Sequence, residues 1–275
     1  MEQEHTYEIS EGLNELVLSA NYATTRSLGQ EAKWTFYNPD CPYKMMFSLH
    51  QAFSRLRTYI PGSKANFLDC GSGNGIPSLL AFFSGFNNVS GIEKSRKLAD
   101  DSRKRLASFI DKKFIPINAV HFAHGSYYRR NLLPDIISRC RKKLLEMSLI
   151  EGLEGTTNFV DYVRAVFGTN HYASVEELIS RYIYPYNADA FDRLGILCKG
   201  KLNTDLVYTY PSDIFFGCAF LPQMALLMKK SSVLAILGPL DDPISISLPE
   251  LKEREPILFP DKIDTNMCLQ VFQKE

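Results

Sequence analysis

A glycine-rich segment that begins with a carboxylate is the part of this sequence with the clearest chemical meaning. Asp69 ends an apolar run and is followed by three glycines at alternate positions, and a second apolar run, 88–92, ends at Glu93. Glycine allows a tight turn and lets the backbone approach a ligand closely. A carboxylate at the end of the next strand can accept hydrogen bonds from ribose hydroxyl groups. The pattern therefore predicts a strand, turn, helix and strand that bind a nucleoside.

The spacing of the glycines separates this loop from other nucleotide-binding loops. It reads G-x-G-x-G, and Ile76 stands where the G-x-G-x-x-G loop of a dinucleotide site has its third glycine. No Gly-Lys-Ser/Thr triplet of a phosphate-binding loop follows. The carboxylate of Asp69 would repel a pyrophosphate, but it would attract the sulfonium and the amino group of S-adenosylmethionine. The loop therefore favours S-adenosyl-L-methionine as the cofactor.

The same segment carries a resemblance to a known family. Residues 60–127 resemble the nucleotide-binding half of class I S-adenosylmethionine-dependent methyltransferases, and Phe67–Gly73 and Gly91–Lys94 are most similar to the non-SET histone lysine methyltransferases. The resemblance implies an α/β, Rossmann-like fold with a seven-stranded mixed sheet flanked by helices. The loop pattern and the resemblance together predict these cofactor-binding residues: Asp69, Gly71, Ser72, Gly73, Asn74, Gly75, Glu93, Lys94, Ser126, Tyr127 and Tyr37.

Two regions of that predicted site rest on the resemblance alone. The family usually has an acid at the end of the third strand for the adenine amino group, whereas this chain has Ser126, a weaker acceptor, followed by Tyr127 to flank the adenine ring. In the family, a loop before the first strand also folds over the cofactor. Tyr37 lies in the matching loop, 29–42, with two further aromatic residues. The alternative is that these aromatics attach the N-terminal helices to the core.

Hydrophobic periodicity extends the expected fold over the rest of the chain. We predict an N-terminal helical segment with the cofactor-covering loop over 1–60 and a methyltransferase domain over 61–275. The final two strands are expected to form an antiparallel pair. The expected strands are 66–69, 88–92, 119–123, one within 203–213, 232–237, 256–259 and 267–272; the expected helices include 77–84, one that begins after Ser95, and 216–228.

A helical insertion is expected at 131–200, between the third and fourth strands, because this interval is too long for one crossover helix. Helical stripes predict helices near 137–147, 159–167, 174–182 and 188–197. One of them is the crossover, and the rest are predicted to cover the active site and select the substrate. The alternative is a solvent-side decoration or a surface that binds a partner.

The exit of the fourth strand supplies the candidate catalytic residues, since ligands of open α/β sheets bind beyond the carboxyl ends of the strands. Methyl transfer is an in-line displacement that requires alignment of the acceptor and removal of its proton. Tyr210 can orient an amine, and Asp213 can act as a base or a charge partner. The alternatives are a packed tyrosine and a helix N-cap, and for Asp213 the cap is favoured.

These residues leave the methyl acceptor open. The first hypothesis is transfer to an amine, for example a protein lysine. The second is a small-molecule N- or O-methyltransferase with the insertion as a lid, which a closed pocket would favour. The third is a catalytically inactive, methyltransferase-like binding scaffold, which Ser126 keeps open. An aminopropyl transferase is a remote fourth, because its usual paired acid after the fourth strand is not evident.

Composition narrows the partners and the cellular setting. The formal net charge is +0, so long-range attraction to nucleic acid is absent and a nucleic-acid acceptor is not expected. The 6 cysteines form no C-x-x-C pair, and no metal site is expected. No apolar run approaches the ~18 residues that a membrane span requires, and the first residues lack a signal segment. We expect a cytoplasmic protein that acts on a protein or a small molecule; the oligomeric state is not specified by the sequence.

Overall fold

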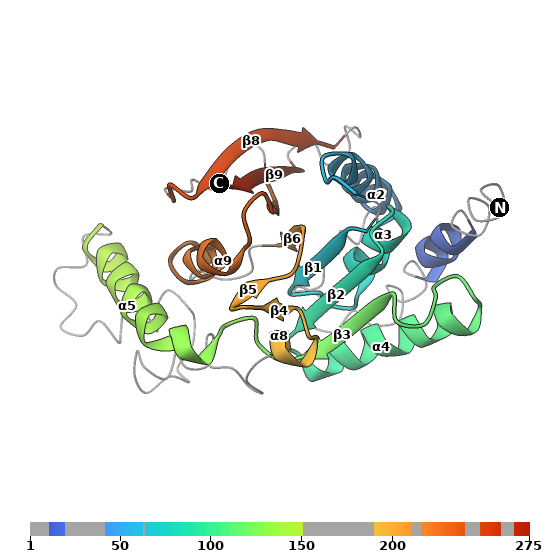
Figure 1. The fold of residues 1–275 in the computed structure, drawn as a ribbon, viewed down its shortest axis with the longest axis horizontal. Coiled ribbons are helices and arrows are strands. Elements are labelled where there is room, and N and C mark those ends of the chain that lie inside the picture. Colours follow the sequence, from blue (N-terminus) through green and yellow to red (C-terminus); the bar gives the residue numbers. More distant parts are fainter. Residues whose placement is uncertain are drawn as a thin grey trace.

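Seven strands form one mixed sheet, which lies at the centre of the computed structural model (Figure 1). The structure describes residues 11–19, 42–62, 64–150, 190–210, 216–239, 248–259 and 267–275. The strand order is β3-β2-β1-β6-β7-β9-β8. The strands are β1 (Asn66–Cys70), β2 (Asn88–Glu93), β3 (Val120–His124), β6 (Leu206–Thr209), β7 (Val233–Pro239), β8 (Leu251–Leu258) and β9 (Met267–Lys274).

The first five strands of this sheet are parallel, and the last two end the sheet with reversed pairings. β1 pairs in parallel with both β2 and β6, β2 with β3, and β6 with β7. β9 lies antiparallel to both β7 and β8. The chain therefore winds outward from β1 in both directions, and the strand order reverses between β1 and β6. Ligands of such sheets bind in the crevice at this reversal, beyond the carboxyl ends of the strands. The predicted Rossmann-like sheet with its antiparallel end is confirmed.

Helices cover both faces of the sheet because alternate strand residues point to opposite sides. Phe67 packs with α2 (Pro42–Thr58), α3 (Ile76–Phe83) and α4 (Arg96–Asp111) on one face. Its neighbour Leu68 packs with α5 (Leu133–Ile150), α8 (Ala190–Arg193) and α9 (Leu221–Leu227) on the other. Figure 1 shows α2 and α3 on one side of the sheet and α9 and α5 on the other.

The N-terminal segment is helical where it is described. Residues 11–19 form a helix, and the buried Leu16 and Val17 belong to the same apolar cluster as α2 and α3. The predicted cofactor-covering loop at 29–42 lies outside the described residues, apart from Pro42, where α2 begins. No described helix combines the length and the apolar character that a membrane span would require.

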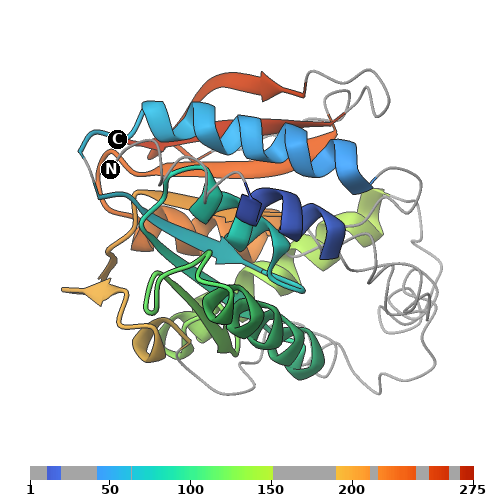
Figure 2. The ribbon, with the colours of Figure 1, turned by 90° about the vertical axis from the view of Figure 1, so that its right-hand side faces the viewer.

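The last helix predicted for the helical insertion is wrong in its extent. The helix expected over 188–197 ends at Arg193, and residues 197–202 form a hairpin of β4 (Leu197–Cys198) and β5 (Lys201–Leu202) instead. Both turn residues, Lys199 and Gly200, have positive φ, at 49° and 78°. Two such residues make the tight turn whose twist matches a two-stranded hairpin. Figure 2 shows this hairpin projecting at the periphery of the molecule. The helices predicted at 159–167 and 174–182 lie outside the described residues.

One acidic residue joins the beginnings of three parallel strands through its side chain and its backbone. The Oδ2 atom of Asp205 accepts a hydrogen bond from the backbone N–H of Asn66 at 2.8 Å, and its Oδ1 atom lies 2.7 Å from Lys229 Nζ. The backbone of Asp205 also bonds Asn66 O at 2.9 Å and Val233 N at 2.8 Å. Asp205 therefore aligns β1, β6 and β7 at the end of the sheet opposite the crevice.

We expect Asp205→Ala to lower the free energy of unfolding by about 2 kcal/mol, since it removes a charge-assisted hydrogen bond to a strand backbone. Lys229→Ala should cost less than about 1 kcal/mol, because its ion pair is partly exposed. Urea unfolding monitored by circular dichroism measures both. Equal losses in the two variants would contradict an alignment role for the Asn66 bond.

Candidate functional site

The glycine-rich loop between β1 and α3 is attached to the end of β2. The backbone N–H groups of Gly71 and Ser72 both donate to Ile92 O at 2.9 Å, and Gly75 N donates to Ser72 O at 2.8 Å. From the side of α4, the Ser102 hydroxyl donates to Gly73 O at 2.9 Å. The loop is thus held by hydrogen bonds to β2 and to α4.

The glycines of the loop serve two different purposes. A Cβ atom at Gly75 would lie 2.8 Å from Phe122 Cζ and 3.0 Å from Ser102 Cβ, at a φ of +84°. Gly75 is therefore required for packing where the loop enters α3. A Cβ atom at Gly71 or Gly73 would meet no described atom within 4 Å. The backbone at these two positions faces open space, as a loop that receives a ligand must.

The carboxylate of Glu93 fastens the loop to the next helix. Its Oε2 atom accepts a bond from Gly73 N at 2.7 Å, and its Oε1 atom accepts one from Ser95 N, also at 2.7 Å. Burial raises the pKa of this carboxyl, while the backbone N–H groups at Ser95 and Gly73 oppose that shift. Since each carboxylate oxygen has about two acceptor positions, Glu93 retains acceptor capacity beyond these two bonds.

Asp69 is a buried carboxylate in which only one of the two oxygen atoms has a hydrogen-bond partner among the described residues. The residue is 1% exposed, and its Oδ2 atom accepts a bond from the Ser78 hydroxyl at 2.7 Å. Among the described residues, its Oδ1 atom has no hydrogen-bond partner. Burial raises the pKa of Asp69 to about 7, the Ser78 bond lowers it, and the charge of Glu93 raises it further. An unpaired buried carboxylate oxygen is unfavourable, so this atom is suited to a donor or a cation supplied by a ligand.

Two buried hydroxyl groups also lack a hydrogen-bond partner among the described residues. Ser72 Oγ and the phenol oxygen of Tyr208 are buried and have no hydrogen-bond partner within the described part of the chain. Tyr208 is paired in register with Asp69, so the two side chains leave the sheet on the same face. Three unpartnered polar atoms therefore occur on the crevice loop and on the two strands that border the reversal of strand order.

The segment after β3 is held from the opposite face of the sheet. Ser126 is buried, and its hydroxyl oxygen accepts a bond from Tyr128 N at 3.0 Å, so it stabilises its own turn. The ring of Tyr127 packs edge-on against Phe220, with ring centroids 5.1 Å apart. Gln223 on α9 holds both sides of this turn: its Nε2 donates to Tyr127 O and its Oε1 accepts from Arg129 N, each at 2.7 Å.

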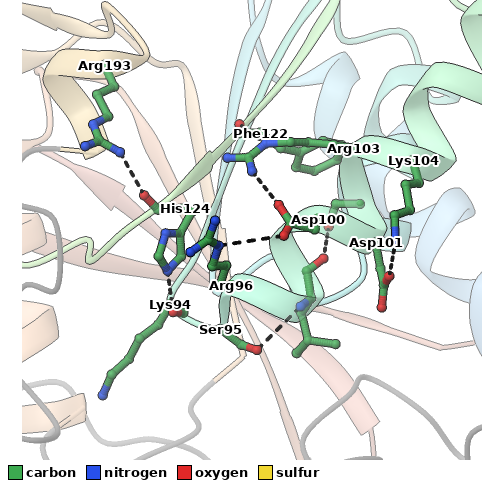
Figure 3. A network of polar contacts seen from close by, with 12 residues as sticks. Lys94, Ser95, Arg96, Asp100, Asp101, Arg103, Lys104, Phe122, His124 and Arg193 are labelled. Atoms are coloured by element: carbon green, nitrogen blue, oxygen red, sulfur yellow. Dashed lines mark hydrogen bonds and ion pairs between the residues drawn. The ribbon is translucent and has the colours of Figure 1, made fainter.

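The remaining predicted residues lie as follows. Lys94 follows Glu93, and its backbone carbonyl accepts a bond from His124 Nε2 at 3.1 Å, while its side chain extends away from His124 (Figure 3). Tyr210 follows β6 and is 47% exposed. Because Thr209 pairs with Cys70, Tyr210 lies at the crevice end of the sheet beside the glycine loop. Asp213 and Tyr37 lie outside the described residues. In the described part of the chain, no group of acidic, histidine and cysteine side chains is arranged for a metal ion.

Several residues that build the site were not predicted from the sequence. Ser78, Ser102 and Gln223 carry no motif, since their partners are an acid, a loop carbonyl and a turn far away in the chain. Ser95 was accessible to prediction: it is expected to cap the next helix, and its side chain does accept a bond from Leu98 N at 3.4 Å. Local capping patterns can be read from sequence, whereas long-range bonds to backbone groups cannot.

The comparison with known proteins yields structural likenesses only. No protein-family model matches the chain, and no curated protein matches it. A variant of MtNAS in complex with S-adenosylmethionine is 13% identical over 98% of this chain and 76% of that chain, with a TM-score of 0.46. A TehB-like SAM-dependent methyltransferase from Corynebacterium glutamicum is 12% identical over 81% of this chain and 87% of that chain (TM-score 0.39). An rRNA methylase from Streptococcus thermophilus is 9% identical over 84% of this chain and 96% of that chain (TM-score 0.41). TM-scores of this size mark distant likenesses, so the functional assignment depends on the chain's own residues.

Gln223→Glu tests how strongly α9 holds the turn after β3. A carboxylate can still accept from Arg129 N, but it leaves the Tyr127 carbonyl without its donor, and we expect a loss of about 2 kcal/mol in the free energy of unfolding at neutral pH. Protonating the new carboxyl restores a donor. Urea titrations at neutral and acidic pH, with the unchanged protein as reference, should therefore show a smaller deficit in acid. A deficit that does not change with pH would argue against this bond.

Proposed function

We propose that this chain is an S-adenosylmethionine-dependent methyltransferase that transfers a methyl group to an amine. The observation that carries the proposal is the unpartnered Oδ1 atom of Asp69, buried at the mouth of a glycine loop that is open at Gly71 and Gly73. A cationic ligand that is also a nucleoside satisfies both features at once. The cofactor supplies an activated methyl group on a sulfonium, so the protein need provide neither a metal nor a covalent nucleophile.

The residues of the crevice fit distinct parts of this cofactor. Asp69 would accept a hydrogen bond from its amino group, which removes the cost of the unpaired buried oxygen. Glu93 would accept ribose hydroxyl groups with its remaining acceptor positions. The open backbone at Gly71 and Gly73 would allow close approach. Ser126 and Tyr127 would border the adenine; the hydroxyl of Ser126 already accepts from Tyr128 N, so it would contribute its proton or a second weak acceptor position.

The acceptor side of the crevice would be formed at the exit of β6. Tyr210 is half-exposed beside the glycine loop, where its hydroxyl can orient an incoming amine. Asp213, three residues further on, is the proposed base or charge partner. Transfer to an amine, of which a protein lysine is one case, needs an exposed approach to the methyl group. The exposure of Tyr210 supports that geometry.

Calorimetric titration with S-adenosylmethionine and S-adenosylhomocysteine tests the proposal directly. We expect binding by the unchanged protein and a loss of affinity of at least about tenfold in Asp69→Asn, where a charge-assisted hydrogen bond is lost. The matched control is Asp205→Asn, which makes the same change at the opposite end of the strands and should leave the affinity unaltered. Absence of binding by the folded, unchanged protein would overturn the assignment in favour of a scaffold.

The pH dependence of binding should report the same carboxyl. With a pKa of about 7 in the ligand-free protein, Asp69 ionises as the pH rises from about 6 to about 8, and affinity for the cationic cofactor should increase severalfold to about tenfold. The sign for stability is opposite. Because folding raises this pKa from 3.8 to about 7, the protein without cofactor loses stability as the pH rises from about 4 to about 7, and the loss levels off above that pH. In Asp69→Asn, the pH dependence of cofactor affinity and of stability that comes from this carboxyl should vanish. A pH-independent affinity in the unchanged protein would contradict the pairing.

Tyr210→Phe separates the acceptor side from the cofactor side. Removing the hydroxyl should lower kcat by about tenfold to a hundredfold, which corresponds to the ~1.5–3 kcal/mol of one hydrogen bond to a charged group, and leave the affinity for S-adenosylhomocysteine unchanged. Transfer of labelled methyl groups to amine-containing acceptors provides the rate, and calorimetry the affinity. A variant with full activity would remove Tyr210 from the proposed machinery.

A further inference from the structure

A cavity of about 360 Å³ lies along the unpaired edge of the sheet, next to β3. Its wall is formed by β3 itself, by α4 and by α8, and the polar side chains that line it are Arg103, His121, His124 and Arg193. No acidic residue lines this cavity within the described part of the chain. It lies outside the glycine-loop crevice and is not explained by methyl transfer.

The two arginines approach the strand edge from two different elements, as Figure 3 shows. Arg103 on α4 donates from Nε to Phe122 O at 3.3 Å, and Arg193 on α8 donates from a terminal nitrogen to His124 O at 3.4 Å. These carbonyls belong to alternate residues of β3 and point away from β2. The arginines therefore cover the edge that another strand would otherwise use. This role needs one N–H group from each guanidinium, which has five.

The cavity carries the positive charge of two lining arginines, and no carboxylate lines it within the described part of the chain. Asp100 is the acid that balances it, with its carboxylate 2.9 Å from Arg103 and 4.0 Å from Arg96. Arg96 does not line the cavity, so the charge balance there is between the guanidinium groups of Arg103 and Arg193 and this one carboxylate, which is paired with Arg103. Planar guanidinium groups bind phosphate oxygens through paired N–H donors.

Two of the residues that line the cavity are histidines, and each is held by a backbone carbonyl. His121 Nε2 lies 3.0 Å from Asn118 O, and His124 Nε2 lies 3.1 Å from Lys94 O. A carbonyl oxygen only accepts, so each Nε2 carries a proton and the ring orientation is fixed. Both histidines line the cavity, so a bound anion would change the chemical environment of their imidazoles.

We propose that this cavity binds a phosphate group, through Arg103 and Arg193. The phosphate can belong to a small phosphorylated ligand or to a nucleic-acid backbone, because both offer the same oxygens to a guanidinium. The site lies beside the carboxyl end of β3, and His124 contacts the carbonyl of Lys94, the residue after Glu93. A ligand held there would extend toward the cofactor crevice from the open edge of the sheet.

The test uses the full chain and follows the imidazole signals by nuclear magnetic resonance during titration with pyrophosphate. We expect saturable shifts for His121 and His124 and none for His50, which is held by Phe83 O at 3.3 Å on the far side of the glycine loop helix. Arg103→Gln and Arg193→Gln should each weaken the affinity at least about tenfold, the effect of one charge-assisted contact. Absence of saturable shifts would overturn the proposal.

Arg254→Gln is the matched control. It removes the same charge from β8, the edge strand on the opposite side of the sheet from β3, where the arginine bonds Gln273. Equal weakening in this control would mean that the effect is only overall charge, and would also overturn the proposal. Unchanged affinity for pyrophosphate in Arg103→Gln and Arg193→Gln would overturn the proposal and would mean that both arginines only cover the strand edge. Arg103→Lys and Arg193→Lys keep the charge and should retain part of the affinity, which separates loss of binding from loss of folding.

Competition distinguishes the source of the phosphate. A nucleoside monophosphate that displaces pyrophosphate at lower concentration than a short single-stranded RNA indicates a small ligand with a terminal phosphate. The reverse order indicates a backbone. Since pyrophosphate binding is measured without S-adenosylmethionine, failure of this proposal is distinguishable from failure of the methyltransferase assignment.

Discussion

The carboxylate of Glu93 holds together the parts on which the crevice depends. It ends β2, accepts the N–H of Gly73 in the glycine loop, and accepts the N–H of Ser95 at the start of α4, both at 2.7 Å. A loop that must keep its backbone open to a ligand cannot be stabilised by packing its own side chains. Here the loop is stabilised by charge-assisted hydrogen bonds from its backbone to Glu93, which are stronger than neutral hydrogen bonds. The shape of the loop is thus fixed without filling the space that a ligand needs.

In contrast to Glu93, the buried carboxylate of Asp69 is only partly satisfied by hydrogen bonds. A carboxylate that is 1% exposed with one unpaired oxygen costs about 1–3 kcal/mol relative to a satisfied group. Only Ser78 offsets part of this cost among the described contacts, and the charge of Glu93 adds to it. Such a group is tolerated in a fold of this size because two apolar clusters, one on each face of the sheet, supply stability elsewhere. The unfavourable position is what makes the carboxylate responsive to a cationic ligand.

The parts of the fold that could be predicted are those in which the pattern is local. The glycine loop, the strands on both sides of it and the Ser95 cap were read from short stretches, and the three strands around the loop lie within one residue of their expected bounds. β8 begins at Leu251, whereas the prediction placed its start at residue 256. The prediction missed the first residues of the strand because residues 252–255 are charged and exposed on an edge strand and show no apolar alternation. The β4–β5 hairpin was missed because its two-residue turn starts with Lys199, a residue type seldom found at positive φ.

The site was harder to predict than the fold because its supporting bonds connect distant elements. Gln223 is the clearest case: a glutamine on α9, behind the sheet, fixes the turn after β3 through two backbone groups. The same turn receives Phe220, which packs on Tyr127 and stacks on Phe216 with centroids 5.0 Å apart. Residues 216–220 form one π-helical turn, a conformation often found next to functional sites. This turn follows the exit of β6 and contacts the segment after β3. The residues that follow the exit of β6 and the proposed adenine side of the crevice therefore share one packed support.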